Sequence, residues 1–353
     1  MFAVRPSLFK RSLPKLVPAL VVVALAATAC DSSDARTSSG PASTLRLGYF
    51  ANVTHAGPVY GVAKGIYQQK LGSTKLKTQT FNAGPAAVEA LFAGAIDAAY
   101  VGPGPAVNAF LKSKGGVVLV AGATSGGASL VVKPGITEAT LKGKKIGDPQ
   151  TGGTQDIALR TYLADKGLKV DKQGGGDVTI VAGDNSQTLD LFKGGTLDGA
   201  WVPEPWASRL VIEGKGTVLV DEKTLWPGGR FITTNLLVNK SFLTQHPQSV
   251  KALLEGQVEA DRQIKANPAQ AQTVVNAALK GLTGKSLKPA IIARAFAQIE
   301  VTEDPLASTL QESAAHAFAT GLVKKGSLKG IYDLTLLRQV LGTSVDDAGL
   351  GRG

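Results

Sequence analysis

Residues 91–101 read LFAGAIDAAYV and residues 191–202 read LFKGGTLDGAWV, and this pair of stretches decides how the chain folds. Each stretch begins on the apolar face of a helix, turns at glycine and continues into a short apolar strand. The two align over Leu-Phe-x-Gly, an Asp and an aromatic-Val pair when one residue is inserted in the second. Chance similarity of two helix–strand units is the alternative. The extent of the agreement favours an internal repeat, so we expect two lobes of similar build.

Strands and helices alternate on both sides of each stretch. The expected strands are 45–50, 76–81, 98–101 and 117–120, then 144–147, 178–181 and 199–202. The expected helices are 58–71, 85–95 and 105–114, then 156–166, 186–192 and 205–213. Such alternation predicts mostly parallel sheets with helices on both faces. The predicted fold class is therefore α/β, with two lobes that are each built on one sheet.

Two connections divide the chain between the lobes. Residues 125–129 (SGGAS) are expected to lead out of the first lobe, and residues 226–234 to lead back. Beyond Phe242 the pattern is helical and most simply completes the first lobe. We therefore predict that lobe one consists of residues 45–124 and 230–353, and that lobe two consists of residues 125–229.

The N-terminus has the features of a secretory signal. Residues 1–29 contain four basic residues and no acidic one, and the uncharged run 16–29 is too short to span a bilayer. The end, Ala27-Thr28-Ala29-Cys30, resembles a bacterial lipobox, in which the Cys is lipidated; an ordinary signal peptide with an incidental Cys is the alternative. Residues 30–44 are expected to form a flexible tether. We expect an exported protein that Cys30 anchors to the outer face of the cytoplasmic membrane.

Composition excludes several classes of protein. The net charge of +11 falls to +7 without residues 1–29, and no Lys/Arg run indicates a nucleic-acid partner. One Cys and three scattered His exclude a disulfide framework and make a metal site improbable. The common catalytic motifs H-E-x-x-H, G-x-S-x-G and G-x-G-x-x-G are absent at the required places. We therefore expect no enzymatic activity, no metal and no cofactor.

Loops after the strands are the expected ligand site, because ligands bind beyond the carboxyl ends of parallel strands. Gly84-Pro85, Gly102–Pro105 and Thr151–Gln155 each open a helix. Helix starts present unpaired N–H groups and a partial positive charge, which suit an anion. Turn punctuation by Gly and Pro is the alternative for any one loop. Three such loops in two similar lobes favour an anion site.

Three other residues leave alternatives open. Glu204 could accept a hydrogen bond from a ligand or cap the following helix. His55 could donate to an anion or lie exposed beside a helix start, and Trp206 could wall an apolar part of the ligand. The predicted ligand-binding residues follow from these loops: Asn52, His55, Gly84, Pro85, Gly102, Pro103, Gly104, Ser125, Thr151, Gly152, Gly153, Thr154, Gln155, Asn185, Glu204 and Trp206.

Residues 45–340 resemble the solute-binding proteins of ABC importers, in the branch that binds aliphatic sulfonates, taurine and nitrate. The motifs that carry the resemblance are 81–85, 91–104, 141–146, 191–206 and His246-Pro247 before a helix. The nearest likeness is to aliphatic-sulfonate-binding lipoproteins. The chain has Thr151-Gly152-Gly153-Thr154 where the family often has a Ser-rich loop, and Glu204-Pro205 where it often has Asp-Pro.

The resemblance implies a type II periplasmic-binding-protein (Venus flytrap) fold that closes on a sulfonate. It places the sulfonate oxygens at Gly84-Pro85, Gly102–Gly104 and Thr151–Gln155. It further implies a monomer that delivers its ligand to an ABC permease with a cytoplasmic ATPase. Alternatives are the same module binding nitrate, taurine or a pyrimidine precursor, and an enzyme on this fold. The signal peptide argues against the enzyme.

Overall fold

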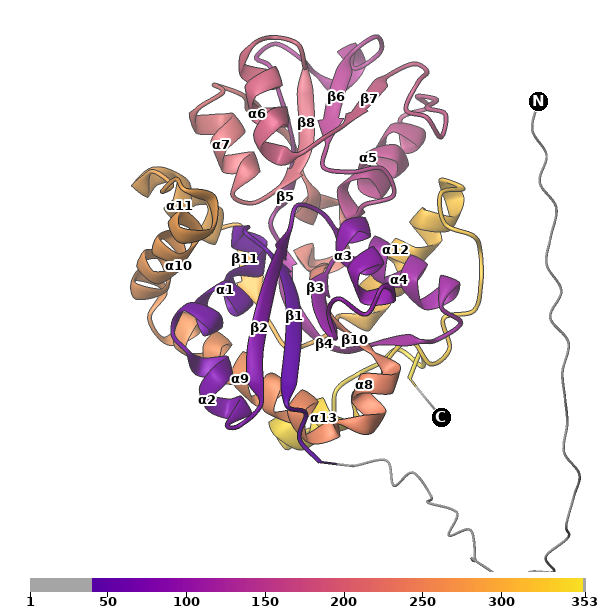
Figure 1. Ribbon diagram of the computed structural model, residues 1–353. Coiled ribbons are helices and arrows are strands. Elements are labelled where there is room, and N and C mark those ends of the chain that lie inside the picture. The colour runs from indigo at the N-terminus through magenta and orange to yellow at the C-terminus, as the bar shows by residue number, and fades with distance from the viewer. Residues whose placement is uncertain (1–39, 352–353) are drawn as a thin grey trace, which may run out of the picture. The chain divides into compact units, whose positions relative to one another are not determined.

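A computed structural model of the chain describes residues 40–351 (Figure 1). The predicted signal peptide, the predicted lipidation site Cys30 and most of the predicted tether lie outside the described residues. Residues from Ser38 onward form one compact unit that contains two sheets. Among its helices, we find none that combines the length and apolar character needed to cross a membrane.

The first sheet has six strands in the order β11-β4-β10-β3-β1-β2. Its strands are β1 (Thr44–Phe50), β2 (Lys75–Phe81), β3 (Ala98–Val101), β4 (Val117–Gly126), β10 (Ile232–Asn239) and β11 (Ile299–Val301). Strand β1 pairs in parallel with β2 and β3, whereas β10 runs antiparallel to both β3 and β4. The carboxyl ends of β1, β2 and β3 therefore share one edge, from which the loops 51–55, 82–83 and 102 emerge.

The second sheet has five strands in the order β7-β6-β8-β5-β9. Its strands are β5 (Ala128–Val132), β6 (Lys145–Asp148), β7 (Thr179–Ala182), β8 (Gly199–Pro203) and β9 (Thr217–Asp221). Strand β6 pairs in parallel with β7 and β8, and β5 lies antiparallel between β8 and β9. The arrangement repeats that of the first sheet. In each sheet three parallel strands lie side by side, and next to them lies an antiparallel strand, β10 in the first sheet and β5 in the second, that belongs to a connection between the lobes.

The two-sheet α/β class predicted from the sequence is confirmed, but the sheets are mixed rather than mostly parallel. The predicted outward connection, 125–129, is almost entirely strand: β4 ends at Gly126 and β5 begins at Ala128. Gly126 and Gly127 make the change of direction with φ values of 77° and 80°, which favour glycine. The predicted return, 226–234, likewise runs into β10. We keep the division into lobe one (45–124 and 230–353) and lobe two (125–229) as a proposal.

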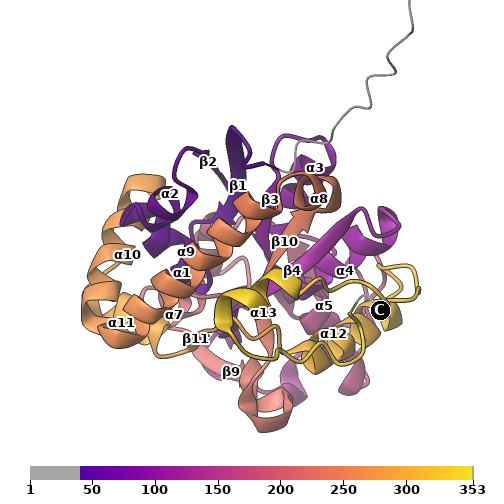
Figure 2. The same cartoon turned by 90° about the horizontal axis from the view of Figure 1, so that it is seen from below.

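Helices cover both faces of each sheet. They are α1 (Ala56–Ala63), α2 (Ile66–Leu71), α3 (Gly84–Phe92), α4 (Pro103–Lys112), α5 (Thr154–Asp165), α6 (Asn185–Lys193), α7 (Trp206–Ile212), α8 (Lys240–Gln245), α9 (Pro247–Ala266), α10 (Pro268–Thr283), α11 (Pro289–Phe296), α12 (Ala307–Ala319) and α13 (Thr335–Leu341). The predicted helix 58–71 is two helices, because Gly65 adopts the left-handed conformation between them. Helix α9 packs against α1 and α2 (Figure 2).

In lobe two the two faces have separate apolar cores. Leu159 and Leu163 of α5 pack against Ile146 on one face. Leu189 of α6 and Leu210 of α7 belong to the cluster on the other face, and Figure 1 shows α5 and the α6–α7 pair on opposite sides of the strands. Burial of these side chains, at about 1.5–3 kcal/mol each, fixes where each helix begins.

The internal repeat is present, but its register differs from the predicted alignment. Helix α6 and strand β8 follow α3 and β3 at a constant separation of 101 residues, so no insertion is needed. Exposure agrees with this register: buried Leu91 corresponds to buried Phe192, and exposed Phe92 corresponds to exposed Lys193. The repeated Leu-Phe letters are therefore offset by one residue in space.

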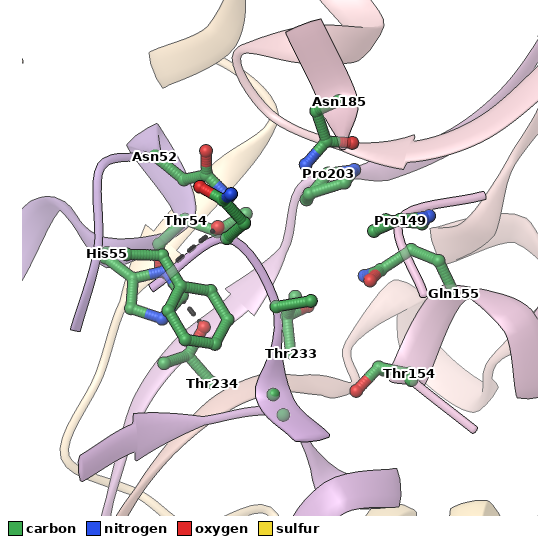
Figure 3. A pocket seen from close by; sticks show the side chains of 16 residues that line it. Asn52, Thr54, His55, Pro149, Thr154, Gln155, Asn185, Pro203, Thr233 and Thr234 are labelled. Carbon is green, nitrogen blue, oxygen red and sulfur yellow. Dashed lines mark hydrogen bonds between the residues drawn. The ribbon is translucent and has the colours of Figure 1, made fainter. Parts of the chain in front are cut away.

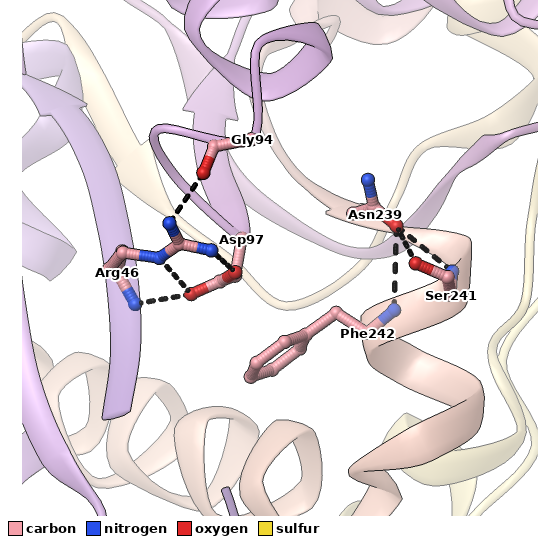
Figure 4. A network of polar contacts seen from close by, with 6 residues as sticks. All are labelled: Arg46, Gly94, Asp97, Asn239, Ser241 and Phe242. Atoms are coloured by element: carbon pink, nitrogen blue, oxygen red, sulfur yellow. Dashed lines mark hydrogen bonds and ion pairs between the residues drawn. The ribbon is translucent and has the colours of Figure 1, made fainter. Parts of the chain in front are cut away.

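An aspartate holds the same place in both repeats. The N–H group of Arg46 donates to Asp97 Oδ2 at 2.8 Å, and the N–H group of Lys145 donates to Asp198 Oδ2 at 2.8 Å. Figure 4 shows how the Arg46 guanidinium also reaches Asp97 and the Gly94 carbonyl. Each aspartate thus ties the start of its strand to the neighbouring parallel strand, which aligns the strand ends that carry the loops.

Candidate functional site

A cleft lies where loops of the two proposed lobes meet, with about 430 Å³ of empty space, part of it open to solvent. It brings together half of the predicted residues, which Figure 3 shows in part. These are Asn52, His55, Gly84, Gly102, Gly153, Thr154, Gln155 and Asn185. The lining residues Pro149, Gly153–Gln155, Asn185 and Pro203 come from lobe two and the others from lobe one, so this cleft lies between the two sheets.

The other predicted residues lie around the cleft rather than in its lining. Thr151 lines an adjoining surface hollow, Pro103 and Gly104 line a pocket on the far side of Thr154, and Trp206 lines a neighbouring cavity. The remaining four are Pro85, Ser125, Gly152 and Glu204. Ser125 Oγ accepts from the Phe231 N–H at 3.3 Å, and the Gly152 N–H donates to Asp156 at 2.7 Å.

Four helices begin at this cleft without a side-chain cap. Their N-cap residues are Ala83 before α3, Gly102 before α4, Gly153 before α5 and Asp184 before α6. None of the four caps its helix through a side-chain hydrogen bond. The first N–H groups of a helix have no partner within it and carry part of the helix dipole. The starts of α3, α5 and α6 therefore present N–H donors from both lobes to one small space, whereas α4 offers few because Pro103 and Pro105 have no N–H group.

The lining contributes no charged side chain to this space. His55 is the one lining residue that could become a cation, and burial lowers its pKa to about 3. Its Nε2 lies 3.4 Å from the Tyr100 carbonyl oxygen, which can only accept, so Nε2 carries the proton. Its Nδ1 then accepts from the Thr54 hydroxyl at 3.2 Å. His55 is buried and neutral, and neither nitrogen is free to bind an anion.

Glycine at the helix starts allows close packing of protein against protein. A Cβ on Gly84 would lie 2.3 Å from Pro105 Cγ, and a Cβ on Gly102 would lie 2.0 Å from Thr154 Oγ1. At Gly102 the effect of glycine is to let lobe two approach lobe one, which brings the Thr154 hydroxyl against the start of α4.

Glu204 is buried and bonded within the protein. Its Oε2 accepts from the Ser208 N–H at 3.0 Å, and its Oε1 accepts from Arg294 Nη1 at 3.2 Å. Burial raises the pKa of this carboxyl, and the bonds from Ser208 and Arg294 oppose that rise. Of the two roles left open from the sequence, the contacts match the cap at the start of α7. Sequence reasoning missed Arg294, which lies 90 residues away and has no local signal.

The backbone at Glu204 also joins the lobes. Its carbonyl oxygen accepts from the Val53 and Thr54 N–H groups at 3.0 and 3.3 Å. Nearby, Trp206 Nε1 donates to Asn52 Oδ1 at 2.9 Å. These contacts hold the loop after β1 against the loop after β8, so they join the two lobes beside the cleft.

Eight further lining residues were not predicted. They are Phe50, Thr54, Asn82, Ala83, Pro149, Pro203, Thr233 and Thr234. Most of them lie beside predicted residues in the same loops. A prediction that named every residue of the loops after the strands would have included them. Thr233 and Thr234 lie on β10, which the sequence analysis assigned to a connection. Recognition of residues 232–239 as a strand was the signal that could have found them.

Beneath the α5 start, two buried carboxyl groups face one guanidinium. Asp148 and Asp156 are fully buried, and Arg160 Nε donates to Asp156 Oδ1 at 2.6 Å. Burial and the neighbouring Asp156 raise the pKa of Asp148 to about 8. Burial and Asp156 thus favour the protonated form of Asp148, which reduces the negative charge under the cleft. In residues 40–351 no group of three His, Cys, Asp or Glu side chains is placed to hold a metal ion.

Comparison with known proteins places the chain among binding proteins. The profile of the NMT1-like family matches residues 38–279. A binding protein of Brucella abortus is 29% identical over 241 residues, which cover 67% of this chain and 72% of that protein.

Two solved structures share the fold. One is the alkanesulfonate-binding protein of Xanthomonas axonopodis pv. citri bound to MOPS, with a TM-score of 0.67, 24% identity and coverage of 81% of this chain and 96% of that one. The other is the periplasmic nitrate-binding protein of Synechocystis PCC 6803, with a TM-score of 0.73, 17% identity and coverage of 89% and 94%. The fold that the resemblance implies is therefore shared with binding proteins of known structure.

Proposed function

Because the chain belongs to the NMT1-like family, we propose that it is the solute-binding protein of an ABC importer and that it captures an alkanesulfonate. One observation carries the choice of an anion: the starts of α3, α5 and α6, which come from both lobes and have no side-chain caps, meet at a cleft without charged side chains. Such a site stabilises negative charge through N–H groups and neutral hydroxyl and amide donors.

The absence of an acidic residue from the lining favours a plain alkanesulfonate over taurine. Taurine carries an ammonium group that a carboxylate would have to offset, and Glu204 is already bonded to Ser208 and Arg294. Nitrate remains the second candidate, since a flat anion can use the same donors, and the fold is shared with a nitrate-binding protein. A pyrimidine precursor is the third; it has no negative charge for the helix starts to stabilise.

Calorimetric titration with ethanesulfonate, taurine, nitrate, sulfate and a hydroxymethylpyrimidine tests this proposal. We expect ethanesulfonate to bind with a micromolar dissociation constant, or roughly −8 kcal/mol, and taurine to bind more weakly. Saturation at about 100 times the dissociation constant should stabilise the protein by about 2.7 kcal/mol and raise its melting temperature. Binding of the pyrimidine without binding of any anion would refute the anion site.

We also propose that the protein is exported and anchored through a lipid on Cys30, and that it acts as a monomer with a permease and its ATPase. Neither enzymatic activity nor a cofactor is part of this proposal. Mass spectrometry of the protein from the membrane fraction should find a diacylated Cys30 at the N-terminus. The variant Cys30→Ala should be released or left unprocessed. A wild-type protein with a free N-terminus at another residue would contradict the anchor.

A further inference from the structure

A second cavity adjoins the cleft on the side of α6, α7, α10 and α11. The two cavities share Asn52, Asn82 and Asn185 in their walls, so they adjoin along these three side chains. The second cavity has about 1350 Å³ of empty space, part of it open to solvent. Its outer wall comes from residues 279–288, far along the chain from the strand-end loops.

Apolar side chains line this second cavity on three sides. Leu189 and Trp206 come from lobe two, Phe81 from the end of β2, and Leu279 and Leu287 from α10 and the segment after it. The lining also includes six uncharged polar residues and six charged ones, three acidic and three basic, whose charges balance. The apolar side chains suit an uncharged group on the ligand.

Trp206 is held with its ring available to such a group. The indole Nε1–H donates to Asn52 Oδ1 at 2.9 Å, and the Arg209 guanidinium carbon lies 4.7 Å from the ring centroid. Because the N–H group is already bonded, the ring offers apolar contact rather than a hydrogen bond. The same Asn52 lines both cavities, so the ring lies next to the wall that they share.

The outer wall is fixed to lobe two. Arg294 of α11 donates to Glu204 at 3.2 Å and to Ser208 Oγ at 3.0 Å, and both acceptors lie at the start of α7. This pair has one fully buried member, Glu204. It holds α11 against α7, which keeps the segment with Leu287 opposite Trp206.

We infer that the second cavity holds the organic part of the ligand, and that the preferred ligand is a sulfonate with an uncharged aromatic or branched-alkyl group. This inference rests on the proposed function, because the sulfonate must lie at the helix starts for its organic part to pass Asn52. A one- or two-carbon sulfonate would leave the apolar walls in contact with water, which forfeits the hydrophobic contribution to binding.

Calorimetric titration of the full chain with methanesulfonate and with benzenesulfonate tests the inference. We expect wild-type protein to bind benzenesulfonate at least about tenfold more tightly. Leu287→Ala should lower that preference to within about threefold and change methanesulfonate affinity little. Trp206→Ala should lower the preference to a similar extent, and because it also removes the bond to Asn52 it should weaken methanesulfonate binding as well. Trp206→Phe keeps a ring without the N–H group and should retain the preference. Leu282→Ala is the matched control on α10, because Leu282 is 42% exposed and outside the wall.

The outcomes separate the two claims. If methanesulfonate binds as tightly as benzenesulfonate, the proposed function stands and the second cavity is not the ligand subsite. If both Trp206→Ala and Leu287→Ala bind both sulfonates as wild type does, or weaken both equally, the inference is overturned as well. If neither sulfonate binds to the wild-type protein, the proposed function and the inference fail together.

Discussion

The α3–β3–α4 unit of lobe one and the α6–β8–α7 unit of lobe two have the same backbone plan but end differently. In both, a helix starts at the cleft and an aspartate ties the following strand to its parallel neighbour. The third element differs: α4 begins at Gly102 without a side-chain cap, whereas Glu204 provides a carboxylate at the start of α7. In lobe two a carboxyl group therefore accepts from an N–H group at this helix start, whereas in lobe one Pro103 and Pro105 have no N–H group to offer.

The paired glycines show which features the repeat preserves. A Cβ on Gly48 would meet Ile96 Cδ1 at 2.8 Å, and a Cβ on Gly147 would meet Leu197 Cδ1 at 2.9 Å. These contacts pack the turn after the helix onto the neighbouring strand in both lobes. Packing of the sheet is therefore common to the two units, while the residues at the cleft edge differ. We infer that shared positions maintain the fold and that differing positions decide what binds.

The largest expected effect comes from bringing a side chain into the contact between the units. In Gly102→Ala the new methyl group would lie 2.0 Å from Thr154 Oγ1, so the lobes could not close. We expect ethanesulfonate affinity to fall by about 100-fold or more, or roughly 2.7 kcal/mol, measured by calorimetry. Adding Thr154→Ala should restore part of the loss. A double variant that binds no better than Gly102→Ala would show that Thr154 is not the obstacle.

The two aspartates should differ in their effect on stability. Asp97 is nearly buried and accepts from both the backbone and the guanidinium of Arg46, whereas the Asp198 side chain is 34% exposed and lies 3.9 Å from Lys144 Nζ. We expect Asp97→Ala to lower the free energy of unfolding by about 2–3 kcal/mol and Asp198→Ala by about 1 kcal/mol. Urea denaturation checks this. Equal losses would mean that the ion pair adds nothing to the shared backbone bond.

The residue after Gly48 in lobe one and after Gly147 in lobe two gives the two lobes a different dependence of stability on pH. Lobe one has Tyr49 where lobe two has Asp148, whose pKa burial raises to about 8. Between about pH 4 and 8 the folded state then binds more protons than the unfolded state, so the free energy of unfolding falls as pH rises. We expect Asp148→Asn to reduce that fall and to stabilise the protein at pH 8 by about 1–3 kcal/mol. Urea denaturation at pH 5 and pH 8 checks this. If the free energy of unfolding changes by the same amount between the two pH values in the variant and the wild type, the result would count against a protonated Asp148.

The smallest effect concerns one hydroxyl group. Thr154 is at the start of α5 and lines the cleft, and Thr154→Val keeps its shape but removes one donor. We expect a loss in ethanesulfonate affinity of about 1–2 kcal/mol with little change in the melting temperature of the unliganded protein. Thr151→Val is the control, because Thr151 lies in the adjoining hollow. Equal behaviour of the two variants would remove Thr154 from the site.

Much of the fold could be predicted from the sequence because the parallel strands and their helices follow local patterns. The strands that join the lobes could not, since β5 and β10 pair with partners far away in the chain. The same limit applies to the site. Gly84, Gly102 and Thr154 stand in recognisable helix starts, whereas Thr233 and Arg294 reach the site or its neighbourhood only through long-range packing.

Two-fold alignment of the repeat illustrates a subtler limit. The Leu-Phe letters at 91–92 and 191–192 suggested an inserted residue, yet the hydrogen bonds repeat at a spacing of 101. The Ala95 N–H donates to the Ala90 carbonyl as the Thr196 N–H donates to the Leu191 carbonyl. Alignment by residue identity therefore placed the helices one residue out of register, whereas alignment by which residues are buried gives the correct register.

The central claim is that helix starts from both lobes hold one anion, and amide chemical shifts test it most directly. In a titration of ¹⁵N-labelled protein with ethanesulfonate, the backbone amides at Gly84 of α3 and at Gln155 and Asn185 of lobe two should shift together. We expect downfield proton shifts at all three positions that fit a single dissociation constant, because each N–H group gains an anionic acceptor. Shifts confined to one lobe, or at neither, would contradict the account.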